Sequence, residues 1–407
     1  MKQKVVIIGH GYTSRLGLIR SLGVEGYDIT VVAIVFHNLF GRLVRLDGGR
    51  PIDCHSKYVG KVYYCQANDK KGLIDLLLKK CTDPSQKVVL IPDSDFSAAV
   101  IDSCQDSLRP HFLFPNINNR AGMVEYWMDK TNQKRLAQEV GLNVAQGITV
   151  SIKDGHFDMP TGVRYPCFTK PKMTLSGGKQ FLCRCQYEPN LWNVLSRVAQ
   201  KYDTEVLVED YLDIDKEYAV VGFADGQNVV IPGVIEFLEN SESHFGIARR
   251  GKIMPTEGFA PLLEQFRKFV SRIGFVGLFD IDFFRCGDSF WFGELNLRYG
   301  GSGYAYTAMG ANLPAMLVRH LCGESYADLV RAIDSSAIYV NERMVLDDYL
   351  HGFINSEQSR AILRSADISF VENEADRGPQ RKLSRVRTLS YLNRIRWKFK
   401  KNNKIKP

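Results

Sequence analysis

Short apolar runs alternate with helix-like segments over about the first 115 residues of the chain. Four runs have the length and continuous hydrophobicity of buried strands: Val5–Gly9, Ile29–Phe36, Val88–Ile91 and Phe112–Phe114. The segments between them that are typical of helices are Ser14–Leu22, Gly72–Lys80 and Phe96–Cys104. This βαβ alternation predicts a parallel sheet with helices on both faces.

The first strand-to-helix turn, residues 9–14, contains Gly9 and Gly11. Backbone N–H groups at such a turn often bind phosphates or carboxylates. As a dinucleotide fingerprint the turn is incomplete, because Ser14 replaces the third glycine and the second strand ends without an acid for the ribose. The pattern argues against a nicotinamide cofactor. It leaves open an anion or substrate site, or a tight turn without a ligand.

Two strand-like segments near residues 280 and 294 carry a cluster of acidic and amide side chains. Residues 279–283 alternate acidic and apolar side chains, so Asp280 and Asp282 share one face of a strand. The same period places Glu294 and Asn296 together. If the strands pair as a hairpin, Asp282, Glu294 and Asn296 converge on a hard cation such as Mg²⁺. An edge hairpin with a solvated polar face is the alternative.

A lysine ends the apolar strand predicted over Val163–Lys170, and a small-residue loop with Gly177 and Gly178 follows it. Such a loop can donate backbone N–H groups to a polyphosphate while Lys170 neutralises its charge. The loop lacks the spacing of a Walker A sequence. A hairpin without a ligand would show the same pattern.

A third pattern is an apolar strand that runs into the polar segment Glu209–Leu212, with Glu217 five residues further on. Backbone groups at such a break can face an adenine edge, and a carboxylate beyond it can accept both ribose hydroxyls. By itself the pattern also fits an ordinary strand, turn and strand.

Along the chain the Lys170 loop comes first, the Glu209–Leu212 segment second and the two acidic strands last. In this order the three patterns resemble the ATP-grasp superfamily of ligases. The helix that opens at Asp129-Lys130 precedes them, and the Glu-x-Asn-x-Arg string that starts at Glu294 closes the series. The resemblance covers about residues 1–325. It implies an α/β fold in which a Rossmann-like pre-domain precedes a two-lobed, α+β ATP-grasp domain.

The resemblance assigns roles to three groups of residues. Those implied to contact ATP through its phosphates, adenine or ribose are Lys130, Lys170, Gly177, Gly178, Glu209, Leu212 and Glu217. The implied ligands of the magnesium ions are Asp282, Glu294 and Asn296. Arg298 matches the arginine that steadies the acyl phosphate, and Lys170 acts with it in catalysis. Asp282 stands where some members have glutamate, which affects its distance from a metal.

The predicted domains are a pre-domain over 1–118, an ATP-grasp domain over 119–330 with a lid lobe at about 150–212, a helical extension over 331–376 and a basic tail over 377–407. The implied reaction is ADP-forming amide synthesis from a carboxylate and an amine, with ATP and Mg²⁺, or Mn²⁺ in its place. The alternatives are an ATP-grasp kinase and a non-catalytic nucleotide-binding protein at a membrane surface.

The net charge of +8 is unevenly distributed. Residues 377–407 hold twelve Lys and Arg and no acid, so the remaining 41 cations and 45 acids give the rest of the chain a net charge of −4. Cations alternate with apolar residues over 380–401, including Trp397 and Phe399. The pattern fits an amphipathic helix on an anionic membrane, and it also fits a structural helix with a solvated end. Nucleic acid is the least favoured partner.

No run of 18 uncharged apolar residues occurs, and we expect a cytoplasmic protein, with the inner face of the membrane as an alternative location. The expected partners are small carboxylate and amine substrates. A lipid-linked acceptor is an extension of this expectation, because the chain is similar to bacterial amino-acid ligases that decorate cell-wall or polysaccharide precursors, including D-aspartate ligase. The sequence does not decide whether the chain forms a homodimer.

Overall fold

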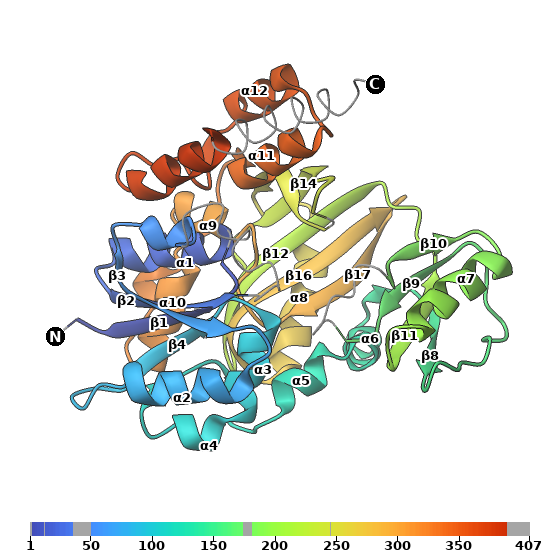
Figure 1. Cartoon of the computed structure of the whole chain (residues 1–407), viewed down its shortest axis with the longest axis horizontal. Coiled ribbons are helices and arrows are strands. Elements are labelled where there is room, and N and C mark those ends of the chain that lie inside the picture. The colour runs from blue at the N-terminus through green and yellow to red at the C-terminus, as the bar shows by residue number, and fades with distance from the viewer. Residues whose placement is uncertain (1, 12, 36–49, 174–180, 245, 389–407) are drawn as a thin grey trace, which may run out of the picture.

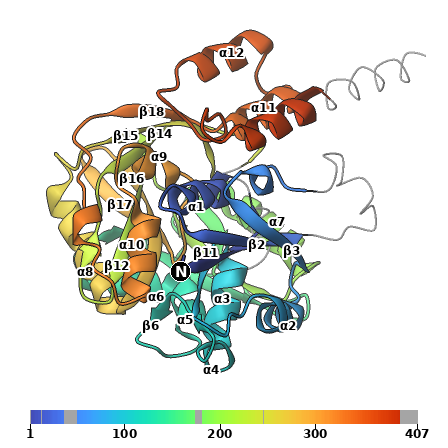
Figure 2. The same ribbon diagram turned by 90° about the vertical axis from the view of Figure 1, so that its left-hand side faces the viewer.

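The computed structural model describes residues 2–11, 13–35, 50–173, 181–244 and 246–388. Figures 1 and 2 show three sheets with helices around them and the C-terminal helices along one side. Among the described residues, no helix is long and apolar enough to cross a membrane.

The N-terminal sheet is parallel, as the βαβ pattern predicts, and its strand order is β3-β2-β1-β4-β5. Its strands are β1 (Lys4–Gly9), β2 (Asp28–Val35), β3 (Val59–Gln66), β4 (Val88–Pro92) and β5 (Phe112–Leu113). The accompanying helices are α1 (Thr13–Val24), η1 (Asp53–His55), α2 (Lys70–Lys80), α3 (Asp95–Ser103) and α4 (Gln105–Leu108). The strand order reverses between β1 and β4, where the carboxyl ends of parallel strands leave a crevice.

The largest sheet has ten strands in the order β19-β18-β15-β14-β12-β16-β17-β7, with β13 on β12 and β6 on β16. The strands are β6 (Asn116–Ile117), β7 (Asn143–Val144), β12 (Lys216–Asp225), β13 (Val229–Val230), β14 (Val234–Asn240), β15 (Ala248–Met254), β16 (Phe275–Cys286), β17 (Ser289–Asn296), β18 (Ala337–Val340) and β19 (Ile368–Ser369). Most pairs are antiparallel, while β17 with β7 and β18 with β19 are parallel.

Alternate residues of β12 face two different cores. Tyr218 and Val220 pack with the apolar face of α8 (Ala260–Ile273), whereas Ala219 and Val221 lie in a core shared with α1 and α10 (Leu313–Leu321). That second core also contains residues of β1, so the N-terminal sheet and the largest sheet are joined by continuous apolar packing. Figure 1 shows α10 on the side of the sheet nearest β1.

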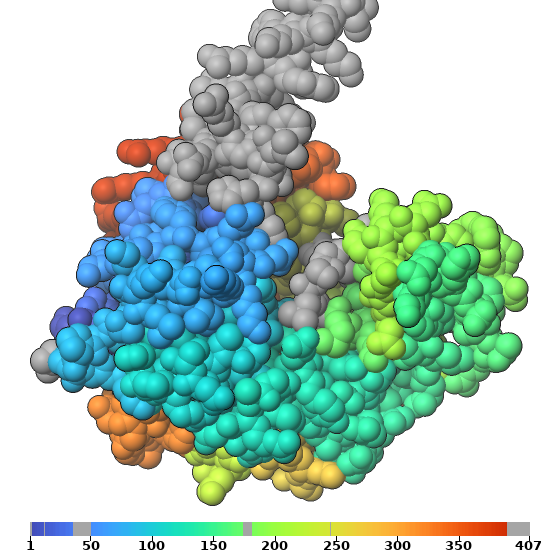
Figure 3. Space-filling model, turned by 60° about the horizontal axis from the view of Figure 1, so that its bottom comes forward, coloured from blue at the N-terminus to red at the C-terminus, as the bar shows by residue number. Residues whose placement is uncertain are grey.

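The segment predicted as the lid lobe has its own four-stranded sheet, in the order β10-β9-β11-β8, and its own apolar core. Its elements are β8 (Gly147–Ile152), β9 (Cys167–Pro171), β10 (Cys183–Cys185), α7 (Glu188–Ala199) and β11 (Thr204–Asp210). In Figure 1 it lies on the far side of the largest sheet from the N-terminal sheet, and Figure 3 shows the surface hollowed between the two.

The remaining helices connect these sheets or follow them. They are α5 (Met123–Met128), α6 (Lys130–Glu139), α9 (Tyr304–Ala308), η3 (Ala327–Leu329), α11 (Glu342–His351) and α12 (Ser356–Arg364), followed by a helix over 377–388. Figure 1 shows α6 between the largest sheet and the lid lobe.

Several elements differ from the sequence-based expectation. The extension over 331–376 contains the strands β18 and β19 as well as two helices, because its backbone completes the edge of the largest sheet. Neither β3 nor β8 was expected from the sequence. Both strands are largely exposed, so apolar and polar side chains alternate only weakly along them.

Candidate functional site

The acidic hairpin forms as the alternating pattern predicts. β16 and β17 are antiparallel neighbours, with Asp282 opposite Glu294 and Asp280 opposite Asn296. On the other face of the same strands, Ile281, Phe283 and Leu295 are buried against α8 and its neighbours. Burial of the apolar face therefore fixes which face presents the four polar side chains.

A β-bulge at Gly293 adjusts this arrangement. Asp282 pairs with Glu294 and the next residue, Phe283, pairs with Phe292, so Gly293 is the extra residue of β17. Without the bulge, Phe292 and Glu294 would share one face, but Phe292 lies in the apolar core and Glu294 on the polar face. A Cβ on Gly293 would lie 2.8 Å from the carbonyl oxygen of Asp282, which explains why glycine occupies this position.

The carboxylates of the hairpin repel one another. Burial raises the pKa of Asp280 to about 6, and burial with the charges of Asp280 and Glu294 raises the pKa of Asp282 well above its usual range. Burial also acts to raise the pKa of Glu294, but Lys130 and Lys170 outweigh it and the net pKa is lowered. A cation near Asp282 and Glu294 would relieve this repulsion.

The donor set fits Mg²⁺ better than a fully protein-bound metal. Within the described residues, no three His, Cys, Asp or Glu side chains form a group that could hold a metal by themselves. Mg²⁺ is commonly bound by one or two carboxylates, with water and phosphate oxygens as further ligands. Asp282 and Glu294, with the amide oxygen of Asn296, meet that requirement.

Two lysines expected at the site lie close to carboxylates of the hairpin and of β11. The ammonium group of Lys130, at the start of α6, lies 3.1 Å from Glu294 Oε2. Lys170 on β9 lies 2.9 Å from Glu209 Oε2. Because both lysines lower the pKa of Glu294, the end of β9 and the start of α6 face the same hairpin.

Lys134, which sequence analysis missed, joins this group. It lies one turn after Lys130 on α6 and forms an ion pair with Glu209 and a hydrogen bond of 2.7 Å to the carbonyl of Ala145. Burial and the neighbouring Lys170 lower its pKa to about 8. The i,i+4 spacing from Lys130 was the available indication, since such residues share a helix face.

α6 is held against the hairpin by paired hydrogen bonds. The Gln133 amide donates to the Leu295 carbonyl at 2.8 Å and accepts from the Leu295 N–H at 2.9 Å. At the start of the helix, the Asp129 side chain accepts from the Thr131 N–H and pairs with Lys172 beyond β9. These contacts position Lys130 and Lys170 relative to the carboxylates.

The expected adenine hinge lies between β11 and β12. β11 is paired on both sides as far as Glu209, and the N–H groups of Asp210 and Tyr211 donate to neighbouring carbonyls. The side chain of Glu209 pairs with Lys134 and Lys170, so it is engaged with cations and does not face an adenine directly. Leu212 is half-buried in the link, and Glu217 accepts a hydrogen bond of 2.9 Å from Asn240. Gly177 and Gly178 lie outside the described residues.

Arg298 connects the hairpin to the N-terminal sheet. Its Nε lies 3.2 Å from Asp95 Oδ1 in the first turn of α3, and its Nη1 lies 3.6 Å from Asp280 Oδ2. The nearby crevice between β1 and β4 holds Arg15, which is fully buried and pairs with Asp53 at 2.5 Å. Sequence analysis did not identify Asp95, Arg15 or Asp53.

The basic segment Arg249-Arg250-Gly251-Lys252 is part of β15. Arg249 pairs with Glu239 and with the buried Asp348 of α11, and Arg250 also pairs with Glu239. Both guanidinium groups are therefore engaged in contacts between strands and with the C-terminal helices.

Residues 135–315 match the family model of the ATP-grasp domain. Among curated proteins, the chain is similar to the carbamoyl phosphate synthase large chain of Gemmatimonas aurantiaca, with 24% identity over 206 residues. That alignment covers 49% of this chain and 19% of the relative, so the chain spans about a fifth of that relative's length.

Solved structures with the same fold include two enzymes. The biotin carboxylase domain of Hydrogenobacter thermophilus 2-oxoglutarate carboxylase, solved with MgADP, ADP and bicarbonate, has a TM-score of 0.63 and 16% identity, covering 83% of this chain and 74% of that one. The L-amino acid ligase of Bacillus licheniformis has a TM-score of 0.59 and 14% identity, covering 83% and 79%.

Proposed function

Because this chain contains an ATP-grasp domain, we propose that it is an ADP-forming ligase that joins a carboxylate to an amine. The observation that carries the proposal is the convergence of Lys130 and Lys170 on the β16–β17 hairpin, where Asp282 faces Glu294. Lys130 and Lys170 supply two positive charges for a polyphosphate, and Asp282 with Glu294 can bind the divalent cation that accompanies it. This arrangement suits a metal–polyphosphate complex.

In the proposed nucleotide site, Lys130 and Lys170 bind the phosphates of ATP. Each pairs with a carboxylate, Glu294 or Glu209, which holds its ammonium group in position. Glu209 thus orients Lys170, and the backbone near Leu212 is left to contact adenine. Glu217 for the ribose and the loop with Gly177 and Gly178 over the phosphates remain part of the proposal.

Asp282, Glu294 and Asn296 would hold Mg²⁺, with Mn²⁺ as a substitute. The metal, when bound, neutralises charge on the β- and γ-phosphates. Arg298 lies between these residues and the N-terminal sheet, where its guanidinium can contact an acyl phosphate while Asp95 orients it.

The proposed reaction has two steps. A carboxylate oxygen of the substrate attacks the γ-phosphorus, and the bond to the β,γ-bridging oxygen breaks with its electron pair leaving on ADP. The amine then forms a C–N bond to the acyl carbon, the C–O bond breaks, and inorganic phosphate leaves and takes up a proton from the nitrogen. Positioning and charge neutralisation suffice for both steps, so no nucleophilic side chain is needed.

Calorimetric titration of MgATP tests the site. We expect Lys170→Ala and Glu294→Ala to bind about 10- to 150-fold more weakly than wild type, because a hydrogen bond to a charged group contributes about 1.5–3 kcal/mol. Lys201→Ala, on an exposed residue just after α7 in the same lobe, is the control and should bind normally. Unchanged affinity in both site variants, or no binding by a folded wild type, would refute the nucleotide site.

Product analysis tests the chemistry. With hydroxylamine as a general acceptor, a panel of amino acids and other small carboxylates should give carboxylate-dependent ADP and a hydroxamate. Amines are then screened with the active carboxylate. Release of ADP that never depends on an acceptor would favour the kinase alternative, and MgATP binding without turnover would favour a non-catalytic role.

We further propose that the acceptor is a cell-wall or polysaccharide precursor attached to a lipid carrier. The basic tail would bind the membrane that contains this carrier. This proposal is supported by the composition of residues 377–407, of which 389–407 lie outside the described residues. Sedimentation with phosphatidylglycerol vesicles compares wild type with Trp397→Ala/Phe399→Ala. An equal bound fraction would remove the membrane part of the proposal.

A further inference from the structure

The helix over 377–388 is fixed to the N-terminal sheet by buried contacts just before it. Asp376 is 1% exposed, pairs with Arg20 on α1 at 3.0 Å and accepts a hydrogen bond of 2.9 Å from the Lys57 N–H. A Cβ on Gly378 would lie 1.9 Å from the carbonyl oxygen of His55, so the first turn lies tightly against η1. The helix therefore presents a defined face to solvent.

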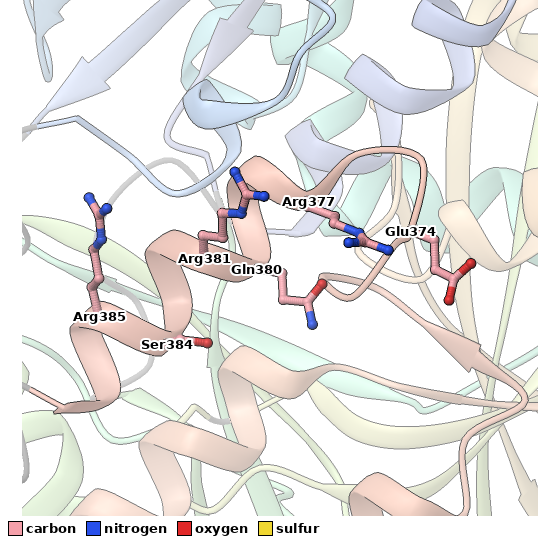
Figure 4. Close-up of a pocket in the computed structure, with 6 residues that line it drawn as sticks. All are labelled: Glu374, Arg377, Gln380, Arg381, Ser384 and Arg385. Atoms are coloured by element: carbon pink, nitrogen blue, oxygen red, sulfur yellow. The ribbon is translucent and has the colours of Figure 1, made fainter.

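That face borders a pocket of about 500 Å³. The residues that line it are Glu374, Arg377, Gln380, Arg381, Ser384 and Arg385. Figure 4 shows the three guanidinium groups spaced along the helix, with Arg381 and Arg385 pointing the same way and Glu374 at the end of the row. None of these residues belongs to the proposed nucleotide site.

The three arginines form a stripe, because positions i, i+4 and i+8 lie on one side of a helix. Among the described residues, no carboxylate lies within ion-pair distance of Arg377, Arg381 or Arg385, and the segment 377–388 contains no acid. Successive guanidinium groups are attached about 6 Å apart along the axis. Their mutual repulsion is relieved when an anion lies between them.

We propose that this pocket binds a soluble small molecule that carries two or more phosphate groups. The planar guanidinium group donates paired hydrogen bonds that match the oxygens of a phosphate, and two such groups one turn apart can each hold one phosphate. The Gln380 amide and the Ser384 hydroxyl add uncharged donors in the same pocket.

The volume of the pocket and the charge at its rim favour a small ligand over an extended anionic surface. Pockets for small molecules are concave and occupy about 300–1,000 Å³, a range that includes this one. Glu374 at the rim places a negative charge where a bilayer or a nucleic-acid backbone would continue past the arginines. A compact phosphate ligand can bind to Arg381 and Arg385 without approaching it.

The test is calorimetric titration of tripolyphosphate at physiological ionic strength with excess Mg²⁺, in a Lys170→Ala/Glu294→Ala background that impairs the proposed nucleotide site. The pocket variant is Arg381→Ala/Arg385→Ala, on exposed residues whose loss leaves the buried anchor intact. The control is Arg360→Ala/Arg364→Ala on α12, an exposed pair with the same spacing and no pocket. We expect one bound tripolyphosphate per chain, affinity at least tenfold lower in the pocket variant, and less than a twofold change in the control.

Equal weakening in both double variants would show a general charge effect and overturn the proposal, as would absence of binding to the folded background protein with its arginines intact. A vesicle arm uses phosphatidylglycerol: we expect the pocket variant to sediment as wild type does. Loss of vesicle binding with unchanged tripolyphosphate affinity would assign the arginines to a membrane instead. Because every comparison is made in the same Lys170→Ala/Glu294→Ala background, failure of the ligase proposal would leave this result readable.

Discussion

Asp93 directly follows the carboxyl end of β4, beside the point where the strand order reverses. Its side chain is buried, and the surrounding charged groups are Arg15 on α1, Asp53 on η1 and Arg298 after β17. The Gly11 N–H faces this carboxyl and acts to lower its pKa. Burial outweighs these neighbours and raises the pKa of Asp93 to about 7.

Asp93→Asn should stabilise the protein at high pH. An acid whose pKa is raised in the folded state binds its proton more tightly there, so wild type loses stability as pH rises from about 4 to about 7. The free energy of unfolding of the variant, relative to wild type, should therefore increase by about 2–3 kcal/mol between pH 5 and pH 8. Urea unfolding followed by circular dichroism measures this, with the exposed Asp75→Asn as control. A pH-independent difference would contradict the buried ionisation.

The β16–β17 hairpin performs two functions with one element. Its apolar face completes the core over α8, while its polar face carries the candidate metal ligands. The bulge at Gly293 keeps apolar side chains on one face of β17 and polar side chains on the other. It lets Phe292 and Glu294 point to opposite faces although they are two residues apart. Backbone geometry at one glycine thus decides where a carboxylate lies.

Gly293→Val should lower stability and weaken MgATP binding together. The new side chain would meet the Asp282 carbonyl and the Phe284 ring at under 3 Å, so the bulge must shift and Glu294 with it. We expect a loss of about 1–3 kcal/mol and at least tenfold weaker binding, measured by urea unfolding and calorimetry.

Gly60→Ala is the matched control, because Gly60 is also the extra residue where β2 pairs with β3. A Cβ there meets nothing closer than 3.4 Å. Normal MgATP affinity in Gly293→Val would show that the bulge does not position the site.

At the scale of the whole molecule, the chain returns from the largest sheet to its own beginning. One apolar core contains residues of β1, α1, α10 and β18, and polar contacts seal its edge. Arg20 donates to the carbonyls of Phe370 and Val371 and pairs with Asp376, and the Glu342 carboxylate accepts N–H groups of residues 370–372. The C-terminal segment is therefore part of the folded unit.

Asp376→Ala should destabilise the fold by about 3–5 kcal/mol, because it leaves the buried Arg20 without its carboxylate. The pair of half-buried Arg319 with exposed Asp328 offers a comparison, and Asp328→Ala should cost less than about 1 kcal/mol. Chemical unfolding measures both. Similar small losses would mean that the Arg20 contact adds little to the attachment of the C-terminal segment.

Patterns that repeat within one element were predictable from the sequence. The period of two in residues 279–283 identified the polar face of β16, and the apolar runs of the first 115 residues identified four of the five strands of the parallel sheet. The ATP-grasp resemblance, which depended on the order of such segments, is confirmed by the match over 135–315. The domain limits and the site roles stay predictions.

Strands could not be predicted from their own residues where neither face of the strand is fully buried. β3 and β8 are largely exposed, and β15 carries Arg249, Arg250 and Lys252, so none of the three shows the apolar pattern of a core strand. Their backbone groups nevertheless pair with neighbouring strands, and hydrogen bonding to a neighbour does not depend on the strand's own side chains.

The sequence by itself determined which segments become strands and helices and which of their faces are apolar, because those properties repeat at the 2.0 and 3.6 periods of the backbone. Only the tertiary structure decided which charges meet: Lys134 with Glu209, Arg298 with Asp95, and Arg15 with Asp53. These partners lie tens to hundreds of residues apart. Their contact follows from strand order and from the packing of sheets onto helices, and neither is encoded in the residues on either side of a charge.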